Sequence, residues 1–327
     1  MSARHFLILI MLVLVLTACS GVSATQELVV ETVHIRLLMG YRPDVQFAPL
    51  YVAAERGYYE NAGIEIEFSH MPETEALQLV GANELQFAIV SGEQTPLARA
   101  QGVPVVYVMA WWQDYPVGIA ASKDSGIETP VDLIGKRVGI PGLYGASYIG
   151  YRAILSTAGV SDADVSLDAI GYNQVEALYE GQEDAVVIYA NNEPLQLEAQ
   201  GFPVNVIRVA DYVHLTSNGL ITNEETIQKN PDLVRRMVEA TLNGLHDTIE
   251  DPDMAYEVAK LYVEGLDQAD EDVLRAVLNA SIGYWKAERL GFSDPSSWEN
   301  MQHVLIEMGL LEEPIDLSQA FTNEFLP

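Results

Sequence analysis

Basic residues and cysteine are both scarce in this chain of 327 residues. Lysine and arginine together number 17 against 47 aspartates and glutamates, which gives a formal net charge of −30 at pH 7. So strong a negative charge repels phosphate backbones and anionic lipid surfaces, and it makes nucleic acid a poor partner. The only cysteine, Cys19, cannot form a disulfide within the chain. A hydrophobic fraction of 49% is nevertheless enough for the cores of two ordinary domains.

Motifs for metal binding and covalent catalysis are missing as well. The six histidines are scattered, and none stands at metal-ligand spacing from another histidine or from a carboxylate cluster. Gly139, Gly142 and Gly145 are each three residues apart, which differs from the glycine spacing of a dinucleotide-binding loop. The sequence shows no nucleophile elbow, phosphate loop or catalytic-triad order. We therefore expect no metal, no resident cofactor and no enzymatic activity.

A single long apolar run stands near the N-terminus. It covers residues 6–16, and its eleven residues are too few to span a bilayer, which needs about 20. Small residues and Cys19 follow, a pattern typical of a secretory signal peptide, and this ending resembles the bacterial lipobox. We predict a lipoprotein signal peptide over 1–18, lipidation of Cys19 and a tether over 19–32. The chain would then be anchored at the extracytoplasmic face of the cell membrane. An ordinary signal peptide with Cys19 nearby by chance is the alternative.

Strand and helix signals alternate through the middle of the chain. The predicted strands lie at 35–39, 64–68, 87–90, 103–111, 117–121, 137–140, 165–170, 185–189 and 204–209. Helical stretches separate them, so we expect parallel sheets with right-handed crossovers. From residue 223 onward the pattern is helical, and Asn230-Pro231 and Asp251-Pro252 are typical helix starts.

These elements predict an α/β protein with two lobes. The first lobe comprises 33–120 together with 214–327, and the second comprises 121–213. The helical C-terminal extension is expected to pack on the first lobe. The chain then crosses between the lobes near Ala120-Ala121 and near Thr216-Ser217. Two crossings make a hinge, and the cleft between the lobes is the natural place for a ligand.

Four segments, in order, carry a family resemblance. They are Phe47–Tyr59 with Gly63-Ile-Glu-Ile66, then Phe87–Gly92, Pro130–Ile140 and Asp251–Ala255. In this order they resemble type II periplasmic binding proteins of the thiamine-precursor-binding and sulfonate/nitrate-binding group, over about residues 33–313. The resemblance implies the two-lobed type II fold and capture of a solute by lobe closure. It also implies a monomer that serves the membrane permease of an ABC importer.

Ligands of α/β sheets sit beyond the carboxyl ends of the strands. Five loops at such ends, with a sixth that follows the strand at 165–170, are rich in rings, amides and hydroxyls. Their ring-bearing candidates for ligand contact are Tyr41, Phe47, Trp111, Trp112, Tyr115, Tyr144, Tyr148, Tyr172 and Tyr189. Their polar candidates are Asp44, Gln46, Ser91, Gln94, Ser147, Asn173, Asn191, Asn192 and Glu193.

This composition favours a flat, uncharged ring system held by stacking, with polar groups at its edges. An anion would want cationic forks, and Arg42 is the only basic residue of the five loops. Backbone donors at 142–147 leave an anion as an alternative. Some candidates also have a purely structural interpretation: one ring of Trp111-Trp112 as core, or Glu193 as a helix-start carboxylate. Arg42 could pair with Asp44 instead of meeting a ligand.

Two segments resemble the riboflavin-binding lipoproteins of the group. They are Asn191–Pro194, after the strand at 185–189, and Gly139–Ser147. The resemblance implies riboflavin or a related flavin as the transported ligand, with a formylamino-pyrimidine thiamine precursor as the second choice. Fungal pyrimidine-synthesis enzymes of the group carry a cysteine-rich motif that is missing here. An enzyme of pyrimidine or flavin metabolism on the same fold is kept as the alternative class.

Overall fold

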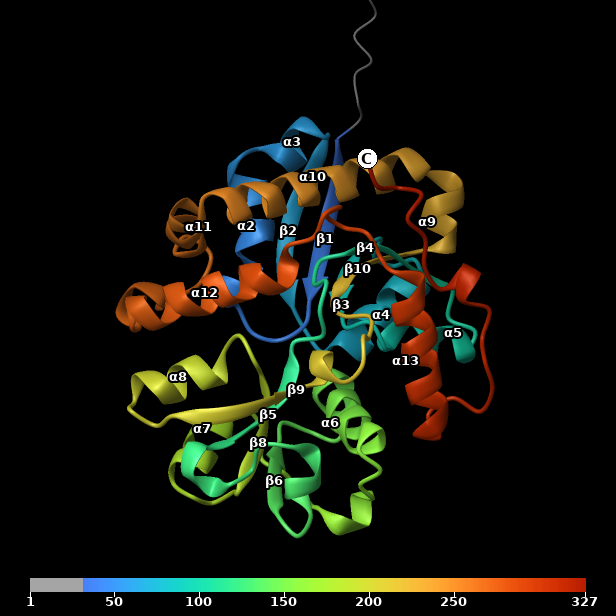
Figure 1. Ribbon diagram of the computed structural model, residues 1–327. Helices are drawn as coiled ribbons and strands as arrows, with labels where there is room; N and C mark the ends of the chain where they lie inside the picture. Colours follow the sequence, from blue (N-terminus) through green and yellow to red (C-terminus); the bar gives the residue numbers. More distant parts are fainter. Residues whose placement is uncertain (1–31) are drawn as a thin grey trace, which may run out of the picture. The chain divides into compact units, whose positions relative to one another are not determined.

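The computed structural model describes residues 32–327 (Figure 1). The predicted signal peptide, Cys19 and all of the predicted tether except Thr32 lie outside the described residues. Within 32–327, none of the helices is both long and apolar enough to cross a membrane. The same residues contain no group of three histidine, cysteine or acidic side chains that could hold a metal ion.

The first sheet has five strands in the order β2-β1-β3-β10-β4. β1 (Val33–Met39) runs parallel to β2 (Ile64–His70) and β3 (Ala88–Val90). β10 (Gly219–Asn223) runs antiparallel to both β3 and β4 (Val105–Ala110). β3, β4 and β10 are buried along their whole length, as expected for strands covered by helices on both faces.

The second sheet also has five strands, in the order β7-β6-β8-β5-β9. β6 (Arg137–Ile140) runs parallel to β7 (Ser166–Ala169) and β8 (Ala185–Tyr189). β5 (Val117–Ser122) runs antiparallel to β8 and to β9 (Val204–Arg208). We call each sheet with the helices on its faces a lobe.

One strand of each sheet departs from the predicted parallel arrangement. β5 and β10 are the first strands after the two crossings, so each leads away from the boundary between the lobes while the other strands lead toward it. The sequence pattern predicts no strand at β10. Its apolar part is only Leu220 and Ile221, which is too short for a period-two signal.

The hinge lies earlier in the chain than the predicted first crossing. All of β5 belongs to the second sheet, so the boundary predicted at Ala120-Ala121 falls inside a strand, and the crossings are residues 111–116 and 212–218. The predicted second crossing lies within the latter segment. Backbone N–H groups of Trp111 and Trp112 donate to the carbonyl oxygen of Asn218 at 3.1 and 3.0 Å. These hydrogen bonds hold the two crossing segments side by side.

Helices cover both faces of the first sheet. On one face they share a core with Ile35, Leu37 and Met39 of β1, and Leu38 faces the other side. The helices of the first face are α2 (Ala48–Glu55), α3 (Tyr58–Asn61), α10 (Pro231–Glu250), α11 (Pro252–Ala259) and α12 (Glu271–Trp285). The opposite face carries α4 (Glu73–Gly81) and α5 (Gln94–Ala100), with α9 (Glu224–Lys229) following β10.

The predicted starts of α10 and α11 are confirmed by their caps. The Asn230 side chain accepts from the N–H of Leu233 at 3.1 Å, and that of Asp251 accepts from the N–H of Met254 at 3.0 Å. Each cap satisfies a donor that the first helical turn leaves free.

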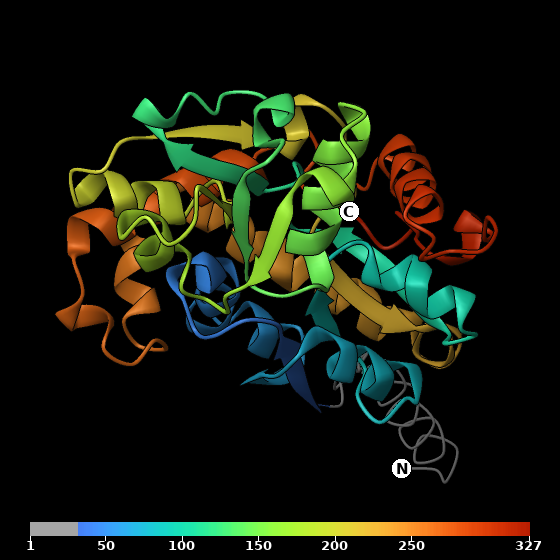
Figure 2. The same ribbon diagram turned by 90° about the horizontal axis from the view of Figure 1, so that it is seen from below.

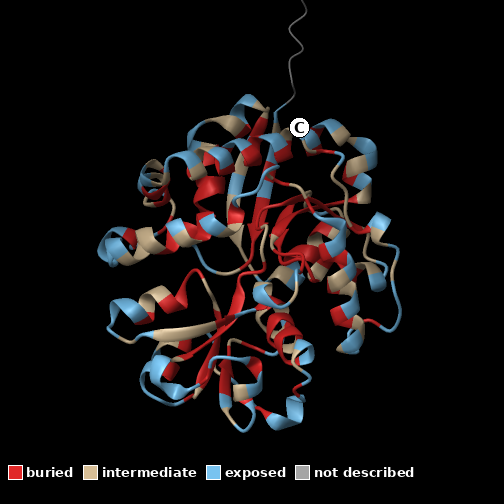
Figure 3. Ribbon diagram, viewed as in Figure 1, coloured by how far each residue is buried: buried red, intermediate tan, exposed pale blue. Residues whose placement is uncertain are grey.

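Helices also cover both faces of the second sheet. α6 (Gly145–Thr157) packs on one face, while α7 (Gln174–Tyr179) and α8 (Glu193–Ala199) lie on the other. Figure 3 shows how the buried residues of both lobes follow the strands and the inner faces of the helices.

The C-terminal extension contacts both lobes, whereas it is predicted to pack on the first alone. In α13 (Pro295–Glu307), Trp298 belongs to the first lobe and stacks on Phe321 with ring centroids 4.8 Å apart. One and two turns later, Met301 and Leu305 join the core of the second lobe. Figures 1 and 2 show α13 beside α6. Apolar side chains on successive turns of one helix therefore serve two cores.

Candidate ligand-binding site

A cavity of about 660 Å³ lies between the two lobes. Its walls are the loops that follow β1, β2, β3 and β4 of the first lobe and β6, β7 and β8 of the second. The carboxyl ends of both sets of parallel strands thus open into one space, as is usual for α/β ligand sites. The volume falls in the range of small-molecule sites, which span about 300–1,000 Å³.

Most of the predicted site residues line this cavity. They are Tyr41, Gln46, Phe47, Ser91, Gln94, Trp111, Trp112, Tyr144, Ser147, Tyr172, Tyr189, Asn192 and Glu193. The predicted residues that do not line it are Asp44, Tyr115, Tyr148, Asn173 and Asn191. Contact with a ligand stays a prediction for every one of them.

The first-lobe wall is a set of buried rings continuous with the core. Trp111 lies between Phe47 and Trp285, with ring centroids 5.5 and 5.7 Å away and interplanar angles of 38° and 30°. Trp112 meets Trp285 edge-on at 5.8 Å. Both Trp111 and Trp112 line the cavity although they are almost fully buried. Each therefore serves the core and the site together, so the two interpretations of this pair do not exclude each other.

The second-lobe wall is much more open. Tyr144, which precedes α6, is 71% exposed, and Tyr172, which follows β7, is 60% exposed. The Tyr172 ring meets Tyr41 of the first lobe edge-on at 5.2 Å. Tyr41 has a φ of 64°, a left-handed conformation that is uncommon for a residue other than glycine. Such strain is typical of residues held in place at a functional site.

Positive charge is scarce in the lining. Arg42 lies over the Tyr41 ring at 5.3 Å and is exposed, and the described residues include no ion pair between Arg42 and Asp44. Burial lowers the pKa of His70, which favours its neutral form. Asp44 instead caps the short 3₁₀ helix η1 (Val45–Phe47), where its Oδ1 accepts from the backbone N–H and the side-chain amide of Gln46.

Glu193 brings a buried carboxyl group to the second-lobe wall. It stands at the start of α8, and its Oε2 accepts from the backbone N–H of Tyr189 at 2.9 Å. Burial raises the pKa of Glu193 to about 7. Glu193 therefore starts a helix and lines the cavity at the same time, so the two interpretations of this residue are compatible.

A second acidic group surrounds Ser91 at the first-lobe wall, where Glu73 and Ser91 line the cavity and the fully buried Glu93 does not. The Oγ of Ser91 stands 2.5 Å from Oε2 of Glu73 and 2.6 Å from Oε1 of Glu93. A hydroxyl carries one hydrogen, so two such contacts require a proton on one of the carboxyl groups. Burial raises the pKa of both glutamates, and the neighbouring Glu73 helps to raise that of Glu93 to about 7. We therefore expect Glu73 and Glu93 to hold one proton between them beside Ser91.

Glu73 and the rest of the loop after β2 are absent from the predicted site. His70 ends β2, which runs parallel to β1, and residues 71–74 follow it directly; all five line the cavity. The rule that ligands bind beyond the carboxyl ends of strands applies to this loop as well. The alternating pattern at 64–68 predicts the strand that it follows, so the sequence could have indicated this loop.

The predicted residues outside the lining have structural partners. The hydroxyl of Tyr115 donates to the carbonyl of Ala146, and the Asn173 amide donates to that of Ile170. Tyr148 points along α6, where Arg152 donates to its hydroxyl at 3.0 Å. These contacts hold the three side chains, none of which is part of the cavity lining.

Two α/β lobes, a double crossing and a cavity between the lobes define the type II periplasmic binding protein fold, the architecture of solute-binding proteins. The periplasmic aliphatic sulphonate binding protein SsuA of Escherichia coli shares it, with a TM-score of 0.72 and 16% identity over 88% of this chain and 96% of that one. The chain belongs to the NMT1/THI5-like family, whose model matches residues 44–255.

Three of the relatives of this chain match it over nine-tenths or more of its length. The riboflavin-binding protein RibY of Chloroflexus aurantiacus is 37% identical over 100% of this chain and 99% of its own. The 4-amino-5-hydroxymethyl-2-methylpyrimidine phosphate synthase of Legionella pneumophila is 26% identical, with 90% and 92% covered. The formylaminopyrimidine-binding protein of Halalkalibacterium halodurans is 26% identical, with 99% of each chain covered.

Proposed function

We propose that this chain is a solute-binding protein that captures riboflavin, or a related flavin, by closing its two lobes. The observation that carries the proposal is the cavity of about 660 Å³ between the lobes, with a buried aromatic wall and one exposed cation in its lining. A flat ring system stacks favourably on such a wall. The full-length similarity to the riboflavin-binding protein of Chloroflexus aurantiacus supports the same ligand.

The polar groups of the lining suit the rest of a flavin. Gln94 and Asn192 offer amides that can both donate and accept, as ring edges and a polyhydroxy chain require. Glu73 and Glu193 bring carboxyl groups from opposite lobes, and neither group supplies the positive charge that a phosphate site needs. An uncharged ligand is therefore favoured over an anion such as the sulphonates named for the Escherichia coli structure.

Delivery completes the proposed role. The sequence pattern at 1–19 supports export and lipidation at Cys19. The protein would act as an anchored monomer outside the cell membrane and would pass the flavin to the permease of an ABC importer. It would need no resident cofactor and would return its ligand unchanged.

A formylamino-pyrimidine is the second candidate ligand, because a relative with 26% identity over nearly its whole length is named for it. A single pyrimidine ring would leave much of the aromatic lining without a partner. The similarity to a synthase makes an enzyme on the same fold the alternative class of function.

Titration of the purified full chain separates these candidates. Stacking of the flavin on the tryptophans should quench riboflavin fluorescence with a saturable, one-site curve. A formylamino-pyrimidine should compete weakly or not at all. Binding of the pyrimidine with no quenching of riboflavin would overturn the proposal, and conversion of bound ligand over hours would replace capture with catalysis.

A further inference from the structure

Asn191 connects the two lobes outside the cavity. It follows β8 in the second lobe and is fully buried. Its Nδ2 donates to Oε1 of Gln46 at 2.7 Å and to Oγ of Ser281 at 2.8 Å. Both partners belong to the first lobe, where Gln46 lies in η1 and Ser281 lies on α12. Figure 1 shows α12 directly above α8, the helix that begins two residues after Asn191.

The two groups that contact the Asn191 amide nitrogen, Oε1 of Gln46 and Oγ of Ser281, can only accept a hydrogen bond from it. The amide nitrogen of Gln46 donates to Oδ1 of Asp44 at 3.1 Å, which turns the Gln46 oxygen toward Asn191. The hydroxyl of Ser281 donates to the carbonyl of Val277 at 2.7 Å, which leaves it only a lone pair to offer. The two partners thus require N–H groups, and the amide of Asn191 supplies both.

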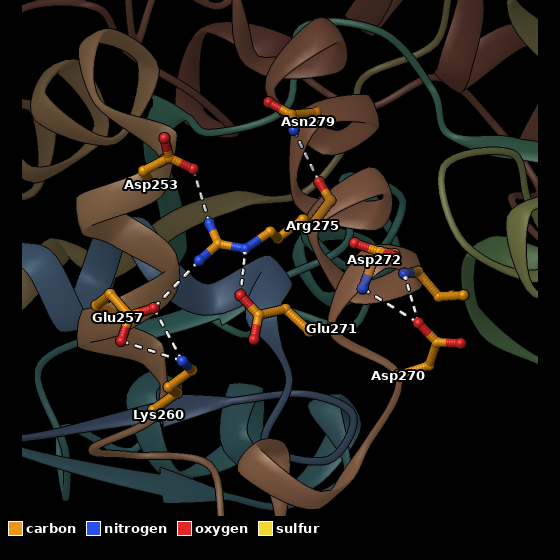
Figure 4. A network of polar contacts seen from close by, with 9 residues as sticks. Asp253, Glu257, Lys260, Asp270, Glu271, Asp272, Arg275 and Asn279 are labelled. Atoms are coloured by element: carbon orange, nitrogen blue, oxygen red, sulfur yellow. Dashed lines mark hydrogen bonds and ion pairs between the residues drawn. The ribbon is translucent and has the colours of Figure 1, made fainter.

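The first-lobe side of this contact is held firmly. Arg275, on the same helix as Ser281, donates to Asp253 at 2.7 Å, to Glu257 at 3.1 Å and to Glu271 at 2.7 Å (Figure 4). These bonds link α12 to α11, and the packing of Trp285 in the first core holds the end of α12 in place. Asn191 therefore meets a rigid surface when the second lobe approaches.

We propose that Asn191 is a positioning residue that latches the lobes in the closed conformation and thereby sets how long the ligand is held. The proposal rests on the proposed capture by lobe closure. The two hydrogen bonds exist only while the lobes are together, because opening separates a second-lobe donor from two first-lobe acceptors. Asn191 does not line the cavity, so its contribution is to the closed state and not to ligand contact. It acts on dissociation and leaves the encounter rate unchanged.

Asn191→Asp is the sharpest substitution, because it keeps the shape and replaces the donor with an acceptor. If Gln46 turned its amide to meet the new acceptor, its oxygen would face Asp44 instead, so one clash persists either way. Stopped-flow measurement of riboflavin fluorescence should show a dissociation rate raised about tenfold, as expected for the loss of roughly two net hydrogen bonds. The association rate should stay within about twofold of wild type.

Asn223→Asp provides the matched control. Asn223 is equally buried, and its amide donates to Val80 and Asn83 within the first lobe. It should lower the Tm without changing the dissociation rate. A dissociation rate for Asn191→Asp within about twofold of wild type would overturn the latch, as would equal changes in both rate constants.

A ligand-free measurement keeps the latch testable even if riboflavin does not bind. Spin labels at Glu75→Cys on α4 and Glu176→Cys on α7 flank the cavity from opposite lobes, in the full chain with Cys19→Ser. The wild-type background should show a short-distance population that Asn191→Asp loses. Identical distance distributions would sink the latch, whereas absence of riboflavin binding by wild type would sink the proposed function alone.

Discussion

The two walls of the cavity are built on opposite principles. The first-lobe wall contains Trp111 and Trp112, whose rings pack against Trp285 in the core, and Phe47, whose ring packs against Trp111. The second-lobe wall presents Tyr144 and Tyr172, which are mostly exposed and touch few neighbours. A ring that is part of the core is fixed before any ligand arrives, while an exposed ring gains its contacts only when the lobes close over one.

The difference teaches where affinity and stability are coupled. A fixed wall lowers the entropy cost of ordering side chains on binding, but its residues cannot be changed without loss of folding free energy. The side chains of an exposed wall lose conformational entropy each time a ligand binds. They can be substituted with almost no effect on the free energy of unfolding. Substitutions in the first-lobe wall should therefore alter both affinity and the free energy of unfolding, whereas substitutions in the second-lobe wall should alter affinity alone.

Trp111→Ala should have the largest effect of any single change in the first wall. Removal of a buried tryptophan costs about 3–5 kcal/mol in the free energy of unfolding, and the loss of a stacking surface should weaken riboflavin binding roughly a hundredfold. Urea denaturation and fluorescence titration measure the two effects. Trp298→Ala is the matched control, since Trp298 is fully buried but lies away from the cavity. It should lose similar stability and keep its affinity; a similar loss of affinity would show that the first wall has no special role.

Stability should also fall as the pH rises, because both walls hold carboxyl groups with raised pKa values. Burial raises the pKa of Glu93 and Glu193 from 4.5 to about 7, so the folded state binds their protons more tightly than the unfolded state does. The contribution of each such group to the free energy of unfolding is then highest below about pH 4.5 and declines toward pH 7, by about 3 kcal/mol. Urea denaturation between pH 4 and 8 should show this slope.

Glu93→Gln tests the first-wall share of that slope. Its amide can donate to Ser91 in place of the shared proton, so the variant should be more stable than wild type at pH 8 and should show a flatter pH dependence. Glu193→Gln is the corresponding change in the second wall. Curves parallel to wild type for both variants would refute the shared proton and the raised pKa values together.

Tyr172→Ala should have a smaller effect that is confined to binding. The ring contacts Tyr41 across the cavity, and such an aromatic pair contributes about 1 kcal/mol. We expect the Kd for riboflavin to rise about fivefold and the Tm to change by less than about 1 °C. Tyr212→Ala, another exposed tyrosine that does not line the cavity, should change neither. A drop in Tm for Tyr172→Ala would mean that the second wall is also part of the folded core.

The sequence predicts the frame of this site better than its internal contacts. Period-two alternation at 64–68 and the apolar runs at 105–110 and 185–189 mark strands, and a loop after a parallel strand belongs near the ligand whatever the details. Trp285 and Trp298 are fully buried, as the helical spacing of the apolar residues in this part of the chain predicts. Such signals depend only on neighbouring residues, so they predict each element without knowledge of how the whole chain packs.

Contacts between distant segments could not be predicted in the same way. Asn191 follows a strand, as a ligand residue would, yet its partner Ser281 is 90 residues away in the sequence and faces it only when the lobes are closed. The contacts of Glu73 and Glu93 with Ser91 likewise depend on the sheet order, which brings the start of α4 beside the loop after β3. Neither hydrophobic periodicity nor a local motif predicts whether a side chain will contact its own lobe or the other one.

Arg275→Gln should have the smallest effect and shows what keeps the first wall fixed. Its partners Asp253, Glu257 and Glu271 are all more than half exposed, and ion pairs of this kind contribute about 1 kcal/mol or less. If apolar packing of Trp285 holds α12 in place, the variant should lose about 1 kcal/mol in the free energy of unfolding and keep its affinity for riboflavin within twofold. High salt should shrink even that loss, because it screens exposed charges. A tenfold weaker affinity would instead mean that the polar network on the outer surface, and not the tryptophan in the core, holds the first wall in its binding position.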